Sequence, residues 1–331
     1  MKLGVLTVPL QEFSTAEAFA YLHELGVQSV ELGTGGYTNR NHLNPEEYLD
    51  NPAKLAEFRA LLQKNELTIS ALSCHGNPVH PDKATAAGYH QVFADTCRLA
   101  QQLEVDTVVA FSGCPGDSES SLRPNWVPCA WPEDFRETLA WQWDEVLIPY
   151  WRDAAALAAS YGVKYIALEM HPGFCVYNPA TMLRLREAVE AASAVDGVAR
   201  AAVGANFDPS HLIWQQMDPC AALQELQGAV YHFHAKDTRV DQYNTAKNGV
   251  LDTGSYGGLA QRSWVFRTVG WGTSEAAWRD MMSTLRLIGY DGAVSIEHED
   301  GLMSVKEGLE KAVAFLKPLV LQEQVGESWW V

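Results

Sequence analysis

Short apolar runs alternate with longer amphipathic segments along this chain, and the pair recurs eight times. The runs are rich in β-branched residues, as buried strands are, and the segments between them carry helix caps and stops. Because parallel strands need a crossover connection, this order predicts a parallel α/β sheet, and eight units predict its closure into a (β/α)₈ TIM barrel. An open, doubly wound sheet is the alternative. The predicted strands cover residues 3–8, 29–32, 68–73, 107–111, 165–169, 203–208, 230–234 and 293–297.

Length and composition agree with one large barrel. The chain has 331 residues, of which 47% are hydrophobic and 20% are charged, so it can bury a large core. We expect a single domain over residues 1–331, with a C-terminal tail at 319–331. Residues 114–132 and 237–273 exceed what a minimal barrel needs, and we expect both to form long loops on the catalytic face, after strands four and seven.

The net charge narrows the class of partner. With 24 basic and 41 acidic residues the formal charge is -17, which repels nucleic acid. We expect no signal sequence and no membrane span. The six cysteines are scattered, so we expect reduced thiols in a cytoplasmic protein; only Cys114 and Cys129 share a loop that suits a bridge. The expected partner is a small-molecule sugar or glycoside. The sequence leaves open whether the protein forms a homo-oligomer.

Ionisable residues follow the ends of four predicted strands, where a strand buried on both faces should stay hydrophobic. Side chains alternate along a strand, so residues two apart share a face, which in a barrel is the interior. Several carboxylates that meet at a narrow barrel mouth repel one another unless a cation lies among them. The residues concerned are Glu169 and His171, Asp208 and His211, His234 and Lys236, and Glu297 and Glu299.

Four of these residues form a predicted metal site. Each alone is more simply explained as a hydrogen-bonded loop residue, but their placement on four consecutive strands favours a shared ligand. Three carboxylates and one imidazole make a hard ligand set that suits Mn²⁺, with Co²⁺, Mg²⁺ or Zn²⁺ as alternatives. We therefore predict one divalent metal ion held by Glu169, Asp208, His234 and Glu297.

Five motifs at these strand ends resemble the xylose isomerase-like barrel family, which includes sugar epimerases, inosose dehydratases and type IV apurinic endonucleases. The resemblance covers nearly the whole chain. It implies that the four predicted ligands are the family's ligands, and that Glu169 and Glu297 exchange a proton with the substrate carbon. It also implies that His211 contacts substrate or supports the site, and that Arg239 lies near a sugar-binding arginine. The motifs are SCHGNP (73–78), LEMHP (168–172), NFDPSH (206–211), HAKD (234–237) and IEHED (296–300).

Three further residues are candidate contacts at the barrel mouth. His75 ends strand three, where it either binds sugar hydroxyls or stabilises its loop. Lys236 either steadies a developing oxyanion or forms a salt bridge with Glu169 or Asp237. Glu31 ends strand two, where it binds either substrate or a lysine or arginine.

These expectations predict a divalent-metal-dependent sugar isomerase or epimerase. A metal on a carbonyl oxygen and its neighbouring hydroxyl stabilises a cis-enediolate, while one glutamate removes a proton and the other returns it. A metal-dependent lyase that cleaves a keto-sugar or a C- or O-glycoside through the same enediolate is the alternative, and a non-catalytic sugar-binding subunit is a third reading. Endonuclease activity is disfavoured, because the charge is negative and strand four ends FSGCPG, without the histidine expected there.

Tryptophans are frequent in the segments expected on the catalytic face. A single tryptophan is more simply explained as packing. Together they hint at a pocket larger than a free monosaccharide requires, as a glycoside would need. They are Trp126, Trp131, Trp214, Trp264 and Trp271.

Overall fold

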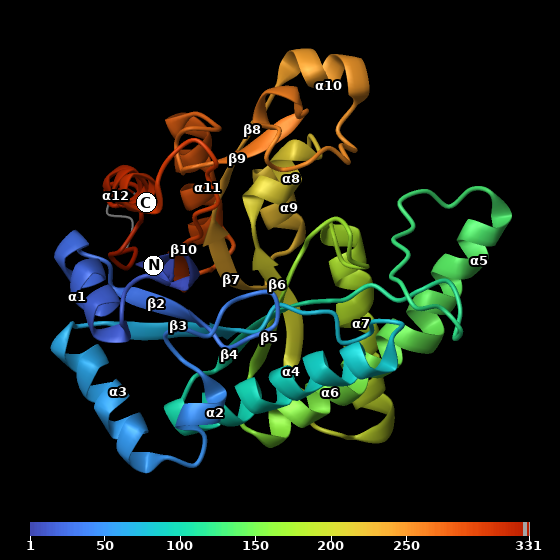
Figure 1. The fold of residues 1–331 in the computed structure, drawn as a ribbon, viewed down its shortest axis with the longest axis horizontal. Helices are drawn as coiled ribbons and strands as arrows, with labels where there is room; N and C mark the ends of the chain where they lie inside the picture. The colour runs from blue at the N-terminus through green and yellow to red at the C-terminus, as the bar shows by residue number, and fades with distance from the viewer. Residues whose placement is uncertain (327–329, 331) are drawn as a thin grey trace.

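The computed structural model describes residues 1–326 and 330, and within them eight parallel strands close into a barrel (Figure 1). Around the barrel the strands follow the order β1, β10, β7, β6, β5, β4, β3, β2. The predicted TIM barrel is confirmed, and the strand ends differ from the prediction by one or two residues. The strands are β1 (Lys2–Leu6), β2 (Ser29–Gly33), β3 (Thr68–Ser73), β4 (Thr107–Phe111), β5 (Tyr165–Glu169), β6 (Ala202–Phe207), β7 (Val230–Ala235) and β10 (Ala293–Ile296).

Helices outside the barrel return the chain from each strand to the next, and local signals set their ends. In the first helix, the Ser14 hydroxyl accepts from the Glu17 N–H while the Glu17 carboxylate accepts from the Ser14 N–H. The same helix stops at Gly26, whose φ of 81° suits glycine. The helices are α1 (Thr15–Leu25), α2 (Pro45–Tyr48), α3 (Pro52–Lys64), α4 (Lys83–Leu103), α5 (Glu133–Trp141), α6 (Ile148–Ser160), α7 (Pro179–Asp196), α8 (Pro209–Trp214), α9 (Pro219–Glu225), α10 (Gln242–Asn248), α11 (Glu275–Leu287) and α12 (Val305–Leu316), with shorter 3₁₀ turns at Val8–Leu10 and Leu259–Gln261 and a π-helical turn at Gln142–Leu147.

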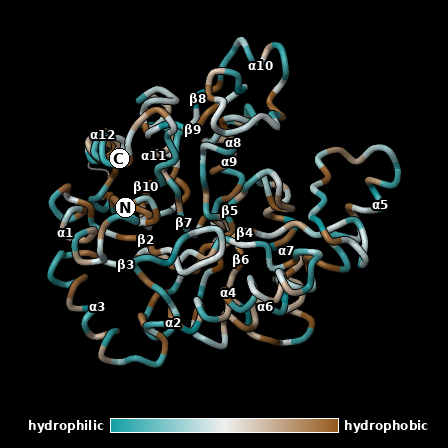
Figure 2. Tube along the Cα trace, viewed as in Figure 1, coloured by the Kyte–Doolittle hydropathy of each residue, from teal (hydrophilic) through white to brown (hydrophobic). Residues whose placement is uncertain are grey.

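The main core lies between the outer face of the barrel and these helices. Phe19, Trp151 and Trp278 are fully buried there, one each from α1, α6 and α11. In Figure 2 the helix α3 alternates between hydrophobic brown and hydrophilic teal, as expected of a helix with one buried face. Small side chains, among them Ala71 and Ala167, form a separate cluster on the inward-facing positions of the strands.

The long segment after β7 contains more regular structure than a loop. Strand β8 (Asp237–Val240) pairs antiparallel with β9 (Trp264–Arg267), and α10 lies between them in the sequence. Helix α8 contacts β8, and Figure 1 shows α8, α10, β8 and β9 rising together beside the barrel. Residues 114–132, after β4, contain no helix or strand before α5 begins. Both segments leave the carboxyl ends of strands, as predicted.

The structure bears on the expectations about membrane spans and about the cysteines. Among the described residues, no helix has the length and apolar character needed to cross a membrane. The six cysteines all lie in the described part of the chain and are free. Cys114 is buried whereas Cys129 is exposed, so this pair does not form a bridge.

A buried carboxylate fastens the segment after β7 to the barrel. Asp237 accepts hydrogen bonds from the backbone N–H groups of Gly270 (2.9 Å), Gly272 (3.0 Å) and Thr273 (3.1 Å). The Thr273 hydroxyl (3.0 Å) and the Trp278 indole N–H (3.2 Å) donate to it as well. Asp237 thus holds the turn that leads into α11, which is a structural role.

We expect Asp237→Asn to lower the free energy of unfolding by about 2–3 kcal/mol, because an amide loses the charge and turns N–H groups toward N–H donors. Urea denaturation followed by circular dichroism would measure this. Asp241→Asn is the matched control: Asp241 caps α10 through its side chain, and asparagine caps helices equally well. Equal stability of the two variants would contradict the structural role of Asp237.

Candidate metal centre and active site

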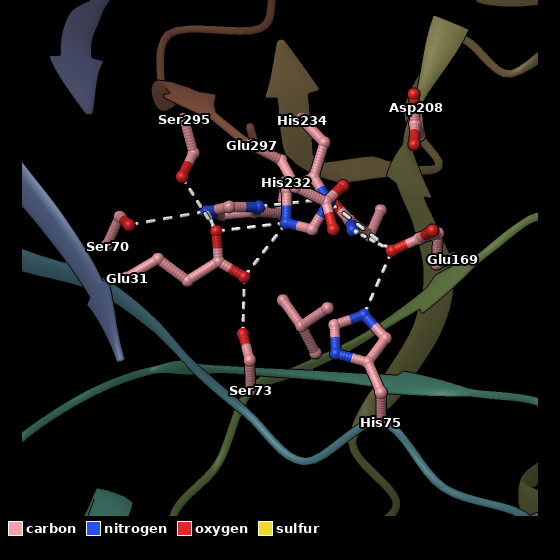
Figure 3. Close-up of polar contacts among 12 residues, drawn as sticks. Glu31, Ser70, Ser73, His75, Glu169, Asp208, His232, His234, Ser295 and Glu297 are labelled. Atoms are coloured by element: carbon pink, nitrogen blue, oxygen red, sulfur yellow. Dashed lines mark hydrogen bonds and ion pairs between the residues drawn. The ribbon is translucent and has the colours of Figure 1, made fainter. Parts of the chain in front are cut away.

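The four predicted metal ligands meet at the mouth of the barrel (Figure 3). One donor atom from each lies within 4.8 Å of those from the others. Glu169 ends β5, Asp208 follows β6, His234 lies in β7 and Glu297 follows β10. Because a closed barrel turns alternate residues of every strand inward, segments far apart in the sequence deliver these side chains to one place.

His234 lies between carboxylates on both sides of its ring. Its Nε2 donates to Glu31, whose oxygens are 2.9 and 3.0 Å away. Its Nδ1 is 3.0 Å from Glu297 Oε2 and 3.3 Å from Glu169 Oε2. With the Nε2 proton committed to Glu31, Nδ1 presents a lone pair to two carboxylates. That arrangement is repulsive unless a proton or a metal cation lies between them.

Unpartnered atoms at the cluster fit a metal ion. Among the described residues, Asp208 Oδ2, His234 Nδ1 and Glu297 Oε2 are buried without a hydrogen-bond partner, which is rare for buried polar atoms. The two carboxylate oxygens form ion pairs with Lys236 Nζ instead, at 3.0 and 2.8 Å. One ammonium group does not offset all the carboxylates gathered here. Three carboxylates and one imidazole nitrogen suit a hard divalent cation.

Glu31 has a partner that the sequence did not suggest. Substrate, lysine or arginine was expected, but the carboxylate binds His234 and also accepts hydrogen bonds from the hydroxyls of Ser295 (2.7 Å) and Ser73. Strands β2 and β7 are not neighbours, so this contact crosses the barrel interior. Burial raises the pKa of Glu31, but the charges of His234 and His232 outweigh it and leave the pKa below its usual value. Glu31 is therefore an anion, and this carboxylate holds the His234 ring in place through a hydrogen bond.

Glu169 is fixed by hydrogen bonds from three directions. His75 Nε2 donates to Oε2 at 2.9 Å, His211 Nε2 donates to Oε1 at 3.1 Å and Asn206 Nδ2 donates to Oε2 at 3.3 Å. Burial raises the pKa of Glu169, but the neighbouring side chains of His211, His234 and His75 bring it well below the usual value. Glu169 is thus a preoriented anion. Asn206 was missed in the sequence, although it stands in the NFD motif two residues before Asp208.

Two histidines beside Glu169 differ in charge. Burial lowers the pKa of His211, but the Asp208 carboxylate, 3.2 Å from its Nε2, outweighs this and brings the pKa to about 9. Burial lowers the pKa of His171 to about 3, and the charge of His211, with ring centres 4.0 Å apart, acts in the same direction. His211 is therefore a cation that contacts two carboxylates. His171 is neutral and lines the cavity at the cluster.

Lys236 lies at the acidic cluster, whereas Arg239 lies outside it. Lys236 is buried, and besides the two ligand carboxylates it pairs with Glu299 at 3.2 Å. Neither of the partners named from the sequence, Glu169 or Asp237, is within ion-pair distance, because Asp237 is held by its turn. The Arg239 side chain is exposed on β8. The structure does not bring it to the cluster, because β8 leaves the barrel to pair with β9.

A cavity of about 140 Å³ opens at the cluster. His75, Lys236, Glu297 and two aromatic residues, Tyr37 and Phe111, line it. Phe111 packs edge-on against His75, with ring centres 4.6 Å apart. No sequence pattern selected either aromatic residue, since Phe111 ends the apolar strand β4 and Tyr37 lies in the loop after β2. The acidic cluster is therefore open to a small polar ligand.

Residues 19–319 match the xylose isomerase-like TIM barrel family. The chain belongs to this family. It is also 36% identical over 324 residues to the uncharacterized protein YfiH of Bacillus subtilis (strain 168), and the match covers 97% of this chain and 100% of that protein.

Several solved structures have the same fold as this xylose isomerase-like barrel. One is the 3-keto-D-glucoside 4-epimerase YcjR from E. coli, with a TM-score of 0.62 and 14% identity over 96% of this chain and 99% of that chain. Another is the IolI protein with a bound zinc atom, with a TM-score of 0.61 and 19% identity over 96% of each chain. At these identities the likeness shows the fold alone.

We expect Mn²⁺ to stabilise the protein against unfolding, because an ion that binds only the folded state adds about 2.7 kcal/mol at one hundred times its dissociation constant. The melting temperature of the Mn²⁺-loaded protein should be about 5 °C higher than that of EDTA-treated protein. Asp208→Asn should abolish the shift, since asparagine keeps the cap of α8 but removes a ligand charge. Identical melting with Mn²⁺ and with EDTA would contradict the metal centre.

We expect Glu31→Gln to weaken Mn²⁺ binding by about 10- to 100-fold, because an amide holds the Nε2 proton of His234 less strongly and leaves Nδ1 less basic. Isothermal titration calorimetry would measure the affinity. Glu57→Gln, an exposed change on α3, is the control. Unchanged affinity in Glu31→Gln would show that the Glu31 contact does not tune the metal centre.

Proposed function

We propose that this xylose isomerase-like barrel is a metal-dependent sugar isomerase or epimerase. The observation that carries the proposal is the pair of glutamates, Glu169 and Glu297, which approach the same imidazole nitrogen of His234 at 3.3 and 3.0 Å. They come from β5 and from the end of β10, which β6 and β7 separate in the barrel. Two carboxylates that reach one small site from different sides suit proton removal and return.

In this proposal Glu169 is the base. Its oxygens are held by His75, His211 and Asn206, so the carboxylate is oriented before substrate arrives. It takes the proton from the carbon beside a carbonyl, and the electron pair moves toward the carbonyl oxygen. Glu297, after taking up a proton from solvent, gives it from the other side: delivery to the same carbon as the carbonyl re-forms inverts that carbon, whereas delivery to the former carbonyl carbon, with loss of the neighbouring hydroxyl proton, gives an isomer. Glu169 then releases the proton it took to solvent.

A divalent cation on Glu169, Asp208, His234 and Glu297, with Mn²⁺ as our first candidate, would supply Lewis-acid stabilisation of the charge that develops on the substrate oxygens. Lys236 adds a fixed positive charge beside the same carboxylates. His75 lines the cavity, so it can also meet sugar hydroxyls. Similarity of the fold to a 3-keto-D-glucoside 4-epimerase supports sugar chemistry of this kind.

Proton exchange with solvent tests the proposal. Mn²⁺-loaded protein incubated with ketoses in D₂O should place deuterium on the carbon beside the carbonyl, as read by NMR. Glu297→Gln should reduce turnover by about 10²- to 10⁴-fold, because a general acid–base group is lost. Glu275→Gln, an exposed change on α11, should leave turnover unaltered.

The other outcomes are equally informative. Release of a β-leaving group would favour the lyase alternative, in which the same carboxylates act. Full turnover in Glu297→Gln would remove this residue from the mechanism. Absence of exchange with every ketose would contradict isomerase and epimerase activity alike.

A further inference from the structure

A second cavity, of about 220 Å³, lies beside the acidic cluster. His171 lines both this cavity and the smaller one at the barrel mouth. His211 lines the second cavity, while its Nε2 lies 3.1 Å from Glu169. A ligand in the second cavity is therefore one side chain away from the proposed base.

Aromatic side chains form the walls of this second cavity. Trp214 and Trp264 stack with ring centres 4.6 Å apart and planes 7° from parallel, and both are buried. Tyr256 meets Trp264 edge-on at 6.0 Å. The Arg262 guanidinium lies 4.3 Å from the Tyr256 ring and 4.6 Å from the Trp264 ring, and its Nε donates to the Trp264 carbonyl. The walls are thus held in place by their own contacts.

Two indole N–H groups at this cavity have no partner. Two other buried tryptophans bond theirs: Trp151 Nε1 donates to a backbone carbonyl at 2.8 Å, and Trp264 Nε1 does so at 3.0 Å. Among the described residues, Trp126 Nε1 and Trp214 Nε1 are buried without a hydrogen-bond partner, although both residues line the cavity. Buried donors normally find an acceptor, and an oxygen of a ligand in the cavity is one acceptor that would satisfy these two.

The lining favours an aromatic ring over a second sugar. The one acidic side chain at the cavity, Asp252, already accepts from the N–H groups of Gly254 (2.8 Å) and Ser263 (2.7 Å). A second sugar would bring several hydroxyls to walls that are mostly ring faces. An aromatic ring with one or two hydroxyls matches both the ring faces and the two free indole donors.

We propose that the cavity formed by Trp126, Trp214, Tyr256 and Trp264 binds the aromatic, hydroxyl-bearing aglycone of a glycoside, while the sugar lies at the acidic cluster. The proposal rests on the proposed function, because it places the reacting sugar beside Glu169. Tyr256 and Trp264 come from the segment between β7 and α11. This segment, rather than the barrel, then selects the substrate.

Calorimetry with the Mn²⁺-loaded full chain tests the aglycone site directly. The probes are hydroquinone, 4-hydroxyphenyl β-D-glucopyranoside, methyl β-D-glucopyranoside and cellobiose. The aryl glucoside should bind at least about tenfold more tightly than the methyl glucoside and cellobiose, and hydroquinone alone should compete with it. Equal affinity for aryl and methyl glucosides, or for cellobiose and the aryl glucoside, would overturn the proposal. Failure of hydroquinone and the aryl glucoside to bind would overturn it too.

Variants at the cavity separate binding from folding. Thr253 is an exposed residue of the lining, so Thr253→Trp narrows the cavity without removing a buried contact. It should weaken binding of the aryl glucoside about tenfold and leave the methyl glucoside unchanged. Trp214→Phe keeps a ring but removes a donor, and should weaken the aryl glucoside severalfold. Trp271→Phe, which changes a half-exposed tryptophan outside the lining, is the control. Full aryl-glucoside affinity in both cavity variants would contradict the site.

The two proposals fail separately. Deuterium exchange with ketoses but no preference for the aryl glucoside would leave the sugar chemistry standing and remove the aglycone site. Tight binding of hydroquinone and the aryl glucoside without exchange in any sugar would keep the aromatic site and remove the isomerase or epimerase function.

Discussion

His234 is buried with a carboxylate facing each of its ring nitrogens, and the rest of the site depends on that contact. Glu31 accepts the hydrogen bond that Nε2–H donates, so Nδ1 is left facing Glu297 and Glu169. Buried charges of one sign are costly unless a counter-charge lies among them. Lys236 supplies part of this charge through ion pairs with Asp208 and Glu297, and a divalent cation on the proposed ligand set would supply the rest. The barrel makes this possible because its strands hold the backbone rigidly on all sides.

The site combines a charged region and an aromatic region. The charged region is built on the strand ends, which the barrel fixes. The aromatic region is built partly from the segment after β7, which Asp237 fastens through backbone N–H groups at 270–273. Asp300 reinforces the same segment by accepting from Arg267 (3.0 Å) and from the Thr268 N–H (2.8 Å). Buried carboxylates thus serve two purposes here: some gather at the proposed metal centre, and others order the segment beside it.

Family membership and site geometry answer different questions. The xylose isomerase-like barrel accounts for the position of the acidic cluster, because ligands in such barrels sit at the carboxyl ends of strands. One fold hosts many activities, so it does not name the substrate. In this chain the segment between β7 and α11 carries two aromatic walls of the second cavity, and on this ground we propose that it takes part in substrate selection.

The sequence by itself determined the barrel and the residues at its mouth. The reason is that strand alternation and helix caps are local patterns, which can be recognised in the sequence alone. It also singled out Glu169, Asp208, His234 and Glu297. Only the tertiary structure gave Glu31 its histidine partner, removed Arg239 from the cluster and stacked Trp214 on Trp264. These contacts join segments that are distant along the chain. Their geometry depends on barrel closure and on the path of the segment after β7, which no local pattern encodes.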